Sequence, residues 1–387
     1  MPPSDTTQLA QQIKSWGQAL GFADVGISDC NLSEQEAQYF NWLGENYHGE
    51  MGYMQEHGTK RTRPQELIPG TQSIVSVRMN YFSDAPEQTL KQLEHSEQAY
   101  ISRYALGKDY HKVMRKRLQQ LAQKILDVEP QLSYRAFADS APVLETSIAH
   151  KAGLGFKGKH SLIIHPRAGS WFFLGELYLS ISLPTDAEPM NQGCGPCTAC
   201  IDECPTGAIL PNNQVDARKC ISYLTIESKA PIPIELRSHI GNRIYGCDDC
   251  QLVCPWNRFL QPNQEPAFTS LYDLSTANLL ELWQWSEQKF LRHFEGSAIR
   301  RIGYEYWQRN LAVAIGNIDS SKQQMQAALQ QLQASVCTSA LVQEHIDWAI
   351  EQLSHRLSHP SDHKHHASRR YYLGKRRVEH SLKADQK

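Results

Sequence analysis

The residues with the clearest chemical signature are cysteines. The chain has ten, and eight of them fall between residues 194 and 254. The first four follow the spacing C-x2-C-x2-C-x3-C-P, and a second group ends at Cys254 and Pro255. Three thiolates on one such loop reach three irons of a [4Fe–4S] cube, while the fourth points to a neighbouring cube. The pattern therefore predicts redox chemistry with two [4Fe–4S] clusters.

The eight cysteines divide into two sets of four, which is the number that two cubes need. By the logic of two-cluster ferredoxins, the first set is Cys194, Cys197, Cys200 and Cys254, and the second set is Cys204, Cys220, Cys247 and Cys250. Structural zinc sites are the alternative, since zinc also accepts four thiolates, but the long run of cysteines favours iron and sulfur. Cys30 and Cys337 have no cysteine at a useful spacing and are predicted to be ordinary buried thiols.

Length and composition limit the class of protein. The 387 residues, 41% of them hydrophobic, suffice for two or three domains with apolar cores. No run of about 18 apolar residues occurs, so we expect no membrane span. The first residues lack the basic start and apolar stretch of an export signal, and clustered cysteines then indicate metal ligands in a cytoplasmic protein. The net charge of −2 neither supports nor excludes a nucleic-acid partner, because binding depends on a local patch.

The cysteines must be positioned by the helices and strands of the rest of the chain. The first such segment runs from about residue 5 to 185. Its patterns alternate between helix and strand, which predicts an α/β domain with a mixed sheet. Strand patterns occur at 73–80, 133–138, 161–165 and 171–183, and helix patterns occur at 109–128, at 144–152 and around Leu9, Ile13, Trp16 and Leu20. Residues 166–169 are predicted to form a hairpin turn between the last two strands.

Two further stretches follow. The segment from about 190 to 260 is rich in Cys, Pro and Gly and needs its metal to fold, because its short loops bury little apolar surface. The segment from about 271 to 357 has the apolar spacing of packed helices, near 276–293, 299–316, 322–333 and 339–357. The tail from residue 358 is His-rich and basic and is predicted to be disordered. Its composition suits RNA contact or merely a soluble end.

Weaker signals lie between the strands. Residues 153–158 satisfy the letters G-x-G-x-x-G, but they follow a helix and precede a strand, which excludes a dinucleotide-binding unit. We expect these glycines to let the backbone approach a large flat ligand. Asp139 ends a strand pattern, where its position alone favours a helix cap over a general acid. The basic residues between Arg103 and Arg117 fit either a nucleic-acid backbone or a solvated helix face, and Lys157, Lys159 and His160 fit a solvated loop.

Taken together, these segments resemble the epoxyqueuosine reductase family, cobalamin-dependent enzymes of the last step of queuosine synthesis in tRNA. The segments that carry the resemblance are 102–111 (SRYALGKDYH), 139–145 (DSAPVLE), 150–160 (HKAGLGFKGKH), the cysteine run, 245–257 (YGCDDCQLVCPWN) and 309–317 (RNLAVAIGN). The resemblance covers about residues 5 to 357. All eight cysteines and Asp139 stand where the family pattern has them.

The resemblance implies a fold and a division into domains. We expect an α/β cobalamin-binding domain at 1–188, which shares its core with reductive dehalogenases. A ferredoxin-like double [4Fe–4S] domain at 189–262 and a HEAT-like α-helical domain at 263–357 follow, and the tail is 358–387. The substrate is then epoxyqueuosine in a tRNA anticodon stem-loop, and the clusters pass electrons to cobalt from an external low-potential donor. The protein is expected to be a monomer without membrane contact.

The resemblance also assigns roles to residues. Asp139 matches the family's proton donor, which reverses the interpretation from position alone. The expected cobalamin pocket consists of Arg61, Ser102, Tyr104, Asp139, His160 and, on the strand 161–164, Ser161, Ile163 and Ile164. Two alternatives remain: a reductive dehalogenase-like cobalamin enzyme that acts on a small molecule, and an electron-transfer iron–sulfur module that docks on a partner.

Overall fold

The computed structural model describes residues 5–82, 86–186, 193–260, 263 and 265–359. Its largest sheet has four strands in the order β1-β2-β7-β4. These strands are β1 (Asp24–Ser28), β2 (Ser73–Asn80), β7 (Phe172–Leu179) and β4 (Tyr134–Phe137). The sequence pattern predicted the bounds of β2 correctly, because its β-branched residues Ile74, Val75 and Val77 favour a strand.

All three pairings in this sheet are antiparallel, so the predicted mixed sheet is wrong for these four strands. β2 and β7 pair along their whole lengths, from Ser73 opposite Leu179 to Asn80 opposite Phe172. The alternation of helices and strands along the chain fits either arrangement, since it does not determine strand direction. A parallel pair does occur elsewhere, between β3 (Tyr100–Ile101) and β8 (Arg243–Tyr245).

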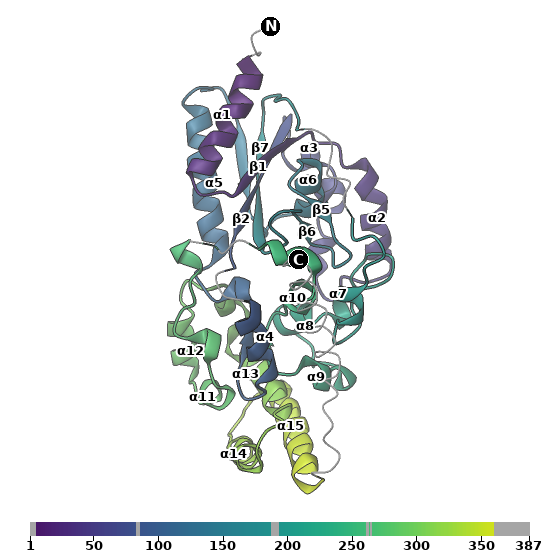
Figure 1. Ribbon diagram of the computed structural model, residues 1–387, viewed down its shortest axis with the longest axis vertical. Helices are drawn as coiled ribbons and strands as arrows, with labels where there is room; N and C mark the ends of the chain where they lie inside the picture. The colour runs from purple at the N-terminus through teal and green to yellow at the C-terminus, as the bar shows by residue number, and fades with distance from the viewer. Residues whose placement is uncertain (1–4, 83–85, 187–192, 261–262, 264, 360–387) are drawn as a thin grey trace, which may run out of the picture.

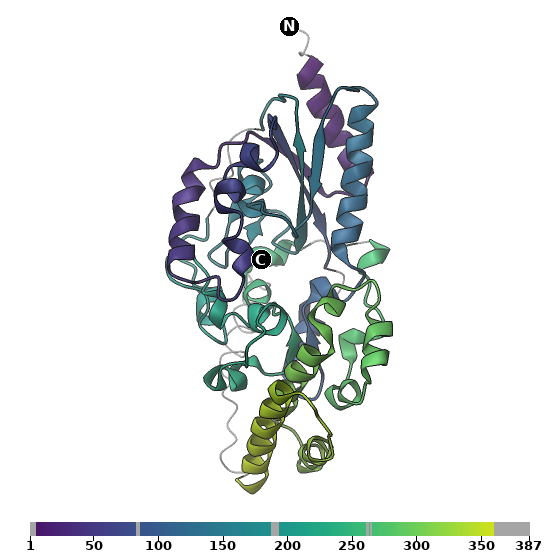
Figure 2. The ribbon, with the colours of Figure 1, turned by 180° about the vertical axis from the view of Figure 1, so that it is seen from behind.

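Helices cover both faces of the sheet (Figure 1). On one side lie α1 (Asp5–Ala19) and α5 (Tyr110–Leu126), whose apolar stripes pack with strand residues such as Val77 and Leu177 in one core. The other side carries α6 (Glu145–Lys151), where Ile148 packs with Phe137 and Tyr178. Figure 2 shows from behind that α1 and α5 lie opposite α2 (Ser33–Gly44).

The predicted hairpin around residues 166–169 forms only in part. His165 and Gly169 make an isolated bridge, but β6 (Ile163–Ile164) pairs with β5 (Phe156–Lys157) instead of β7. Gly155 permits this pairing, because a Cβ there would lie 2.5 Å from the Ile164 carbonyl oxygen. A Cβ on Gly158 would likewise meet Ile164 and His160. Gly155 thus admits the chain's own backbone and Gly158 admits neighbouring side chains, while the approach of a flat ligand stays a prediction.

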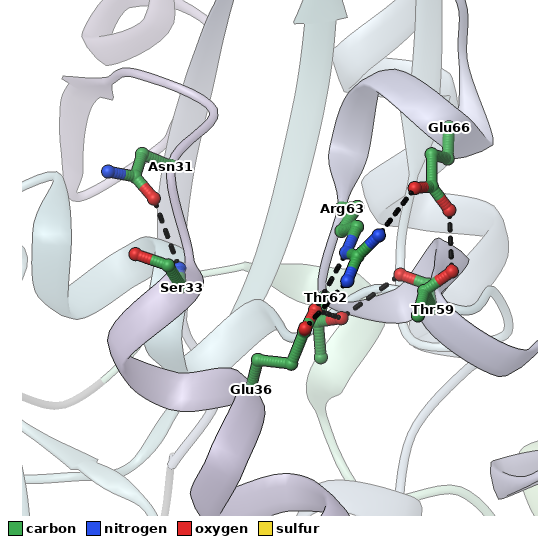
Figure 3. A network of polar contacts seen from close by, with 7 residues as sticks. All are labelled: Asn31, Ser33, Glu36, Thr59, Thr62, Arg63 and Glu66. Atoms are coloured by element: carbon green, nitrogen blue, oxygen red, sulfur yellow. Dashed lines mark hydrogen bonds and ion pairs between the residues drawn. The ribbon is translucent and has the colours of Figure 1, made fainter.

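A polar network on the surface fixes the segment that carries Arg61 (Figure 3). Arg63 pairs with Glu36 of α2 at 2.9 Å and with Glu66 at 3.0 Å, and Thr62 donates to the same Glu36 carboxylate at 2.5 Å. These contacts join α2 to η2 (Gly58–Arg61) and α3 (Pro64–Leu67). Exposed ion pairs contribute little stability each, so the network serves mainly to fix the position of this loop.

The cysteine-bearing segment lies between the sheet and the C-terminal helices (Figure 1). Its elements are α7 (Ala199–Asp202), η4 (Ala217–Lys219), α8 (Ile221–Ile226), α9 (Ile234–Ile240), β8, α10 (Asp249–Leu252) and η5 (Pro255–Phe259). The β3–β8 pair ties it to the first stretch of the chain, and Ile101, Tyr245 and Leu311 share one apolar core. The domain division predicted from the sequence stays a prediction.

The C-terminal part is helical, as predicted. Its elements are α11 (Leu279–Trp283), α12 (Glu287–His293), η8 (Ala298–Ile302), α13 (Gly303–Gly316), α14 (Lys322–Gln333) and α15 (Ala340–Ser358), and α4 (Pro86–Glu94) lies beside them. The helix expected at 276–293 is two helices, because Asn278 and Ser286 each accept a hydrogen bond from a backbone N–H at a new helix start. Among the described residues, no helix is both long and apolar enough to cross a membrane. The tail prediction lies outside the described residues from 360 onward.

Candidate functional site

The eight clustered cysteines line two neighbouring cavities. A cavity of about 240 Å³ is lined by Cys194, Cys197, Cys200 and Cys254. A larger one, of about 340 Å³, is reached by Cys204, Cys220, Cys247 and Cys250. All of these cysteines are free thiols. The structure therefore brings four thiols to each cavity, although the assignment of ligands to clusters stays a prediction.

The two Cys-rich loops are built alike. Two short helices, α7 and α10, carry Cys200 and Cys250 at corresponding points of two Cys-rich loops. Across the described ranges, no three His, Cys, Asp or Glu side chains converge as ligands of one metal ion would. Zinc needs its four ligands within bond distance of one centre, whereas a cube of irons and sulfides holds its thiolates farther apart.

The larger cavity extends from these cysteines to the sheet. Five of the residues expected to bind cobalamin line it, namely Ser102, Tyr104, His160, Ser161 and Ile163. Phe172 and Phe173 at the start of β7 add aromatic surface, and Tyr104 stacks edge-on to Phe173. Ser102 is held in place because its hydroxyl donates to buried Asp248 at 2.5 Å. A largely apolar wall with a few fixed polar groups is typical of a site for a flat cofactor.

Three of the expected pocket residues, Arg61, Asp139 and Ile164, line neither cavity. Arg61 is buried, and its guanidinium donates to the carbonyl oxygens of Ala141, Val143 and Tyr53 at 3.2–3.4 Å. Arg61 therefore stabilises the loop that follows Asp139 through hydrogen bonds to its backbone. Ile164 packs in a small apolar cluster with Phe156 and Cys254.

His160 lines both cavities and is buried. Its Nδ1 accepts from the Leu162 backbone N–H at 3.2 Å, and its Nε2 has no hydrogen-bond partner among the described residues. Burial lowers the pKa of His160 to about 4, so the ring is neutral and Nε2 carries the proton. A buried donor without a protein partner fits a polar edge of a bound group. The neighbouring Ser161 has φ 70°, a strained backbone conformation typical of ligand sites.

Asp139 lies beside this cavity, at the end of β4. Its Oδ2 accepts from the hydroxyl of Tyr110, which lines the cavity, and from Nε2 of His111 at 3.0 Å. The other ring nitrogen of His111 lies 2.7 Å from Asp109 Oδ1. Asp109 caps α5, so the helix start places this histidine between two carboxylates. Asp139 is half exposed and thus accessible to a substrate.

These contacts determine where protons reside. Burial disfavours a charged imidazole, but hydrogen bonds to Asp109 and Asp139 outweigh it and raise the pKa of His111 to about 9. Burial alone would raise the pKa of Asp139, yet the hydrogen bonds from His111 and Tyr110 hold it below the usual value. The pair is therefore imidazolium and carboxylate at neutral pH. It holds one transferable proton next to the cavity.

The basic residues divide into structural and surface groups. Arg103 is buried and donates to Thr89 at 3.0 Å, and Arg117 donates to the Leu20 carbonyl oxygen at 2.8 Å, so neither tracks a nucleic acid. Lys159 donates to the carbonyl oxygens of Gly195 and Cys197, which supports the first cysteine loop. The exposed basic residues of this part are Lys108, Lys112, Arg115, Lys116 and Lys157.

Sequence reasoning missed the partners of Asp139. Asp109, Tyr110 and His111 stand in the segment that carries the resemblance, and an Asp two residues before a His at a helix start is a signal for their pairing. Glu145 was missed as well, although it accepts from the Asp139 backbone N–H. Glu176 was detectable as a lone acidic residue inside the apolar run FFLGELYL.

Two sets of four thiols beside an acid–base pair and a cofactor-sized cavity define an iron–sulfur oxidoreductase. Residues 61–140 match the family model described as epoxyqueuosine reductase QueG, DUF1730, and residues 193–257 match the 4Fe-4S double cluster binding domain. The epoxyqueuosine reductase of Pseudomonas aeruginosa is 52% identical over 353 residues, which cover 91% of this chain and 96% of that protein. The chain belongs to the epoxyqueuosine reductase family.

Solved structures agree with this family. An epoxyqueuosine reductase bound to an epoxyqueuosine-modified stem loop of tyrosine tRNA is 25% identical, with a TM-score of 0.77 over 96% of this chain and 99% of that chain. The Bacillus subtilis epoxyqueuosine reductase, described with an aspartate-bearing catalytic loop swung out of its active site, is 26% identical. Its TM-score is also 0.77, and the match covers 96% of this chain and 98% of that one.

Proposed function

We propose that this chain reduces the epoxide of epoxyqueuosine, at the wobble position of a tRNA anticodon stem-loop, to give queuosine. The observation that carries this proposal is the Asp139–His111 pair beside a cavity that ends at four cysteines. Removal of an epoxide oxygen requires electrons together with protons for the departing oxygen. The proposed source of electrons, the clusters at the cysteines, and the proposed source of protons, the Asp139–His111 pair, lie at the same cavity.

Asp139 is the proposed proton donor. Its carboxyl is accessible, and the proton that it delivers comes from Nε2 of His111 through their shared hydrogen bond. Tyr110 holds the same carboxylate oxygen and so orients it. A positioned general acid of this kind contributes roughly 10²- to 10⁴-fold to a rate. The aspartate-bearing catalytic loop of the B. subtilis enzyme, described as swung out of its active site, supports a catalytic role for the corresponding loop here.

The resident cofactors are proposed to be cobalamin and two [4Fe–4S] clusters. The larger cavity would hold part of the cobalamin molecule. Tyr104, Phe173 and Ile163 offer apolar contacts there, and His160 Nε2 offers a hydrogen-bond donor. The two sets of cysteines would hold the clusters. When bound, these groups supply the electrons for the reduction. The chain's own residues bind them, exclude water and deliver the proton.

The tRNA partner is supported by the solved complex of a relative and by charge at the site. Arg115 donates to Ser140, next to Asp139, and Arg301 lies close enough to lower the pKa of Asp139. An anionic backbone would be attracted to this rim. We assign the HEAT-like helical part, α11 to α15, to the support of the stem-loop. The external low-potential electron donor, the monomeric state and the cytoplasmic location are part of the same proposal.

Two measurements on anaerobically reconstituted protein test the proposal. Cobalamin should co-elute with the protein, and its visible bands should change when a strong reductant is added. In gel shifts at low salt, tRNA that carries epoxyqueuosine should bind, and it should bind more tightly than unmodified tRNA. Clusters without retained cobalamin would indicate an electron carrier instead. Retained cobalamin without any RNA shift would point to a small-molecule substrate.

A further inference from the structure

Glu176 is an acidic residue in the middle of an apolar strand. It is fully buried on β7, opposite Ser76 of β2 and Phe137 of β4. Neither carboxyl oxygen has a hydrogen-bond donor among the described residues, and the Ser76 hydroxyl beside it is equally unpartnered. A buried carboxylate without a donor is very costly, and such a group takes up a proton instead. The position therefore requires a neutral Glu176.

The group that faces Glu176 is the carboxyl of Glu145, the first residue of α6. Two carboxyl groups make a hydrogen bond only when one of them carries a proton. Burial and the charge of Asp139 raise the pKa of Glu145 to about 8, and burial together with Glu145 raises the pKa of Glu176 well above its ordinary value. The two carboxyls thus share at least one proton at neutral pH.

Glu145 in turn holds the backbone of Asp139. Its Oε1 accepts from the Asp139 N–H at 2.5 Å. Asp139 has φ 58°, in the left-handed region that L residues rarely adopt. Such a conformation costs about 1–3 kcal/mol and persists only where neighbours hold it. The hydrogen bond to Glu145 helps to keep the Asp139 backbone in this conformation, in which the Asp139 side chain faces His111 and Tyr110.

We propose that Glu145 and Glu176 are positioning residues, a proton-sharing carboxyl pair that latches the Asp139 loop in the conformation in which its carboxyl faces His111. The catalytic meaning of the latch rests on the proposed function, whereas the latch itself rests on the hydrogen bond from the Asp139 N–H to Glu145 and on the buried, unpartnered carboxyl of Glu176. The titratable groups that face the pair are Asp139 from the loop, His111 and Tyr110 from α5, and Tyr178 from β7. Loss of the shared proton at alkaline pH leaves adjacent carboxylates, which repel each other and release the loop.

The test compares three variants of the cluster-loaded protein by hydrogen exchange of residues 138–145 and by turnover. Glu176→Leu removes the shared proton, and Glu145→Ala removes the contact with the Asp139 N–H. Each should speed exchange of this segment about tenfold and lower kcat by a similar factor with little change in KM. Glu176→Gln should restore slow exchange and turnover, because its amide donates to Glu145 as the protonated carboxyl does.

A merely structural Glu176 gives a different result. An apolar leucine in place of an unpaired buried acid leaves the thermal midpoint unchanged or raises it, and exchange and turnover would then stay at the level of the unchanged protein. That result overturns the latch. The proposed function is tested separately. If Asp139→Asn keeps full turnover, the assignment of Asp139 as the acid fails. Faster hydrogen exchange of residues 138–145 in Glu176→Leu would still establish the latch.

Discussion

His111 Nε2 lies 3.0 Å from Asp139 Oδ2, while its Nδ1 lies 2.7 Å from Asp109, so one imidazole bridges two carboxylates that are 30 residues apart in the chain. The bridge joins the start of α5 to the end of β4. Because both ring nitrogens face acceptors, the ring donates from both only when it is charged. This arrangement stores a proton beside the cavity that the cysteines reach.

Asp139→Asn should abolish proton delivery and leave the cofactor sites intact. We expect kcat to fall by about 100-fold or more, in line with the loss of a general acid. The measurement is turnover of an epoxyqueuosine stem-loop, together with the iron content and visible spectrum of the same sample. Asp127→Asn, an exposed position at the end of α5, is the matched control and should retain full turnover. Equal turnover in both variants would make Asp139 a turn residue.

His111 should make the stability of the protein depend on pH in a defined direction. Its pKa is raised to about 9 in the folded protein, so the folded state binds the proton more tightly than the unfolded chain. The stabilisation is fully present below the ordinary value of 6.5 and is lost as the pH rises through about 9. The thermal midpoint of the unchanged protein should therefore exceed that of His111→Gln clearly at pH 6 and much less at pH 9.5. A difference that does not depend on pH would contradict the bridge.

Cys220 is the cysteine outside the two repeats, so its replacement tests the composition of the second set. In Cys220→Ser the iron content should fall from about eight to about four atoms per chain, because each cube holds four irons. Iron analysis and the visible absorption of anaerobically purified protein measure this. Cys30→Ser is the control, since the Cys30 thiol donates to the Thr71 carbonyl oxygen at 3.7 Å and lines neither cavity. Full iron content in Cys220→Ser would remove Cys220 from the ligand set.

Arg309 connects the C-terminal helices to the cysteine-bearing segment. It is fully buried on α13 and donates to the carbonyl oxygens of Leu224, Ser228 and Ala230 at 2.6–2.9 Å. Arg309→Met leaves these acceptors unpaired and should cost about 3 kcal/mol of folding free energy. Since α8 begins directly after Cys220, iron should also be lost more easily. Arg300→Met, at an exposed position on η8, should change neither the thermal midpoint nor the iron content.

The sequence was most informative where function depends on local spacing. The cysteine runs, the strand at 73–80 and the helix from 110 onward are local patterns, and the structure has them where the spacing predicted. The direction of the strands in the main sheet was not predictable in this way, because it depends on which distant segments pair. His111, Glu145 and Glu176 approach Asp139 from α5, α6 and β7, and no single stretch of sequence brings these side chains together.

Arg61 illustrates the limit of a resemblance. A motif assigns a residue to a pocket, but the structure places the Arg61 guanidinium against the carbonyl oxygens of the loop after Asp139. Its contribution to the site is therefore through the loop that it supports. Whether the remaining residues of the expected pocket touch cobalamin stays a prediction.

The most direct test of the account is the conversion of the modified base itself. Purified tRNA that carries epoxyqueuosine is incubated anaerobically with reconstituted protein, cobalamin and a strong reductant, and its nucleosides are then analysed by mass spectrometry. We expect epoxyqueuosine to be replaced by a nucleoside lighter by one oxygen atom, identical in mass to queuosine, and we expect Asp139→Asn not to produce it at a comparable rate. Unconverted epoxyqueuosine in the presence of intact clusters and reduced cobalamin would contradict the account.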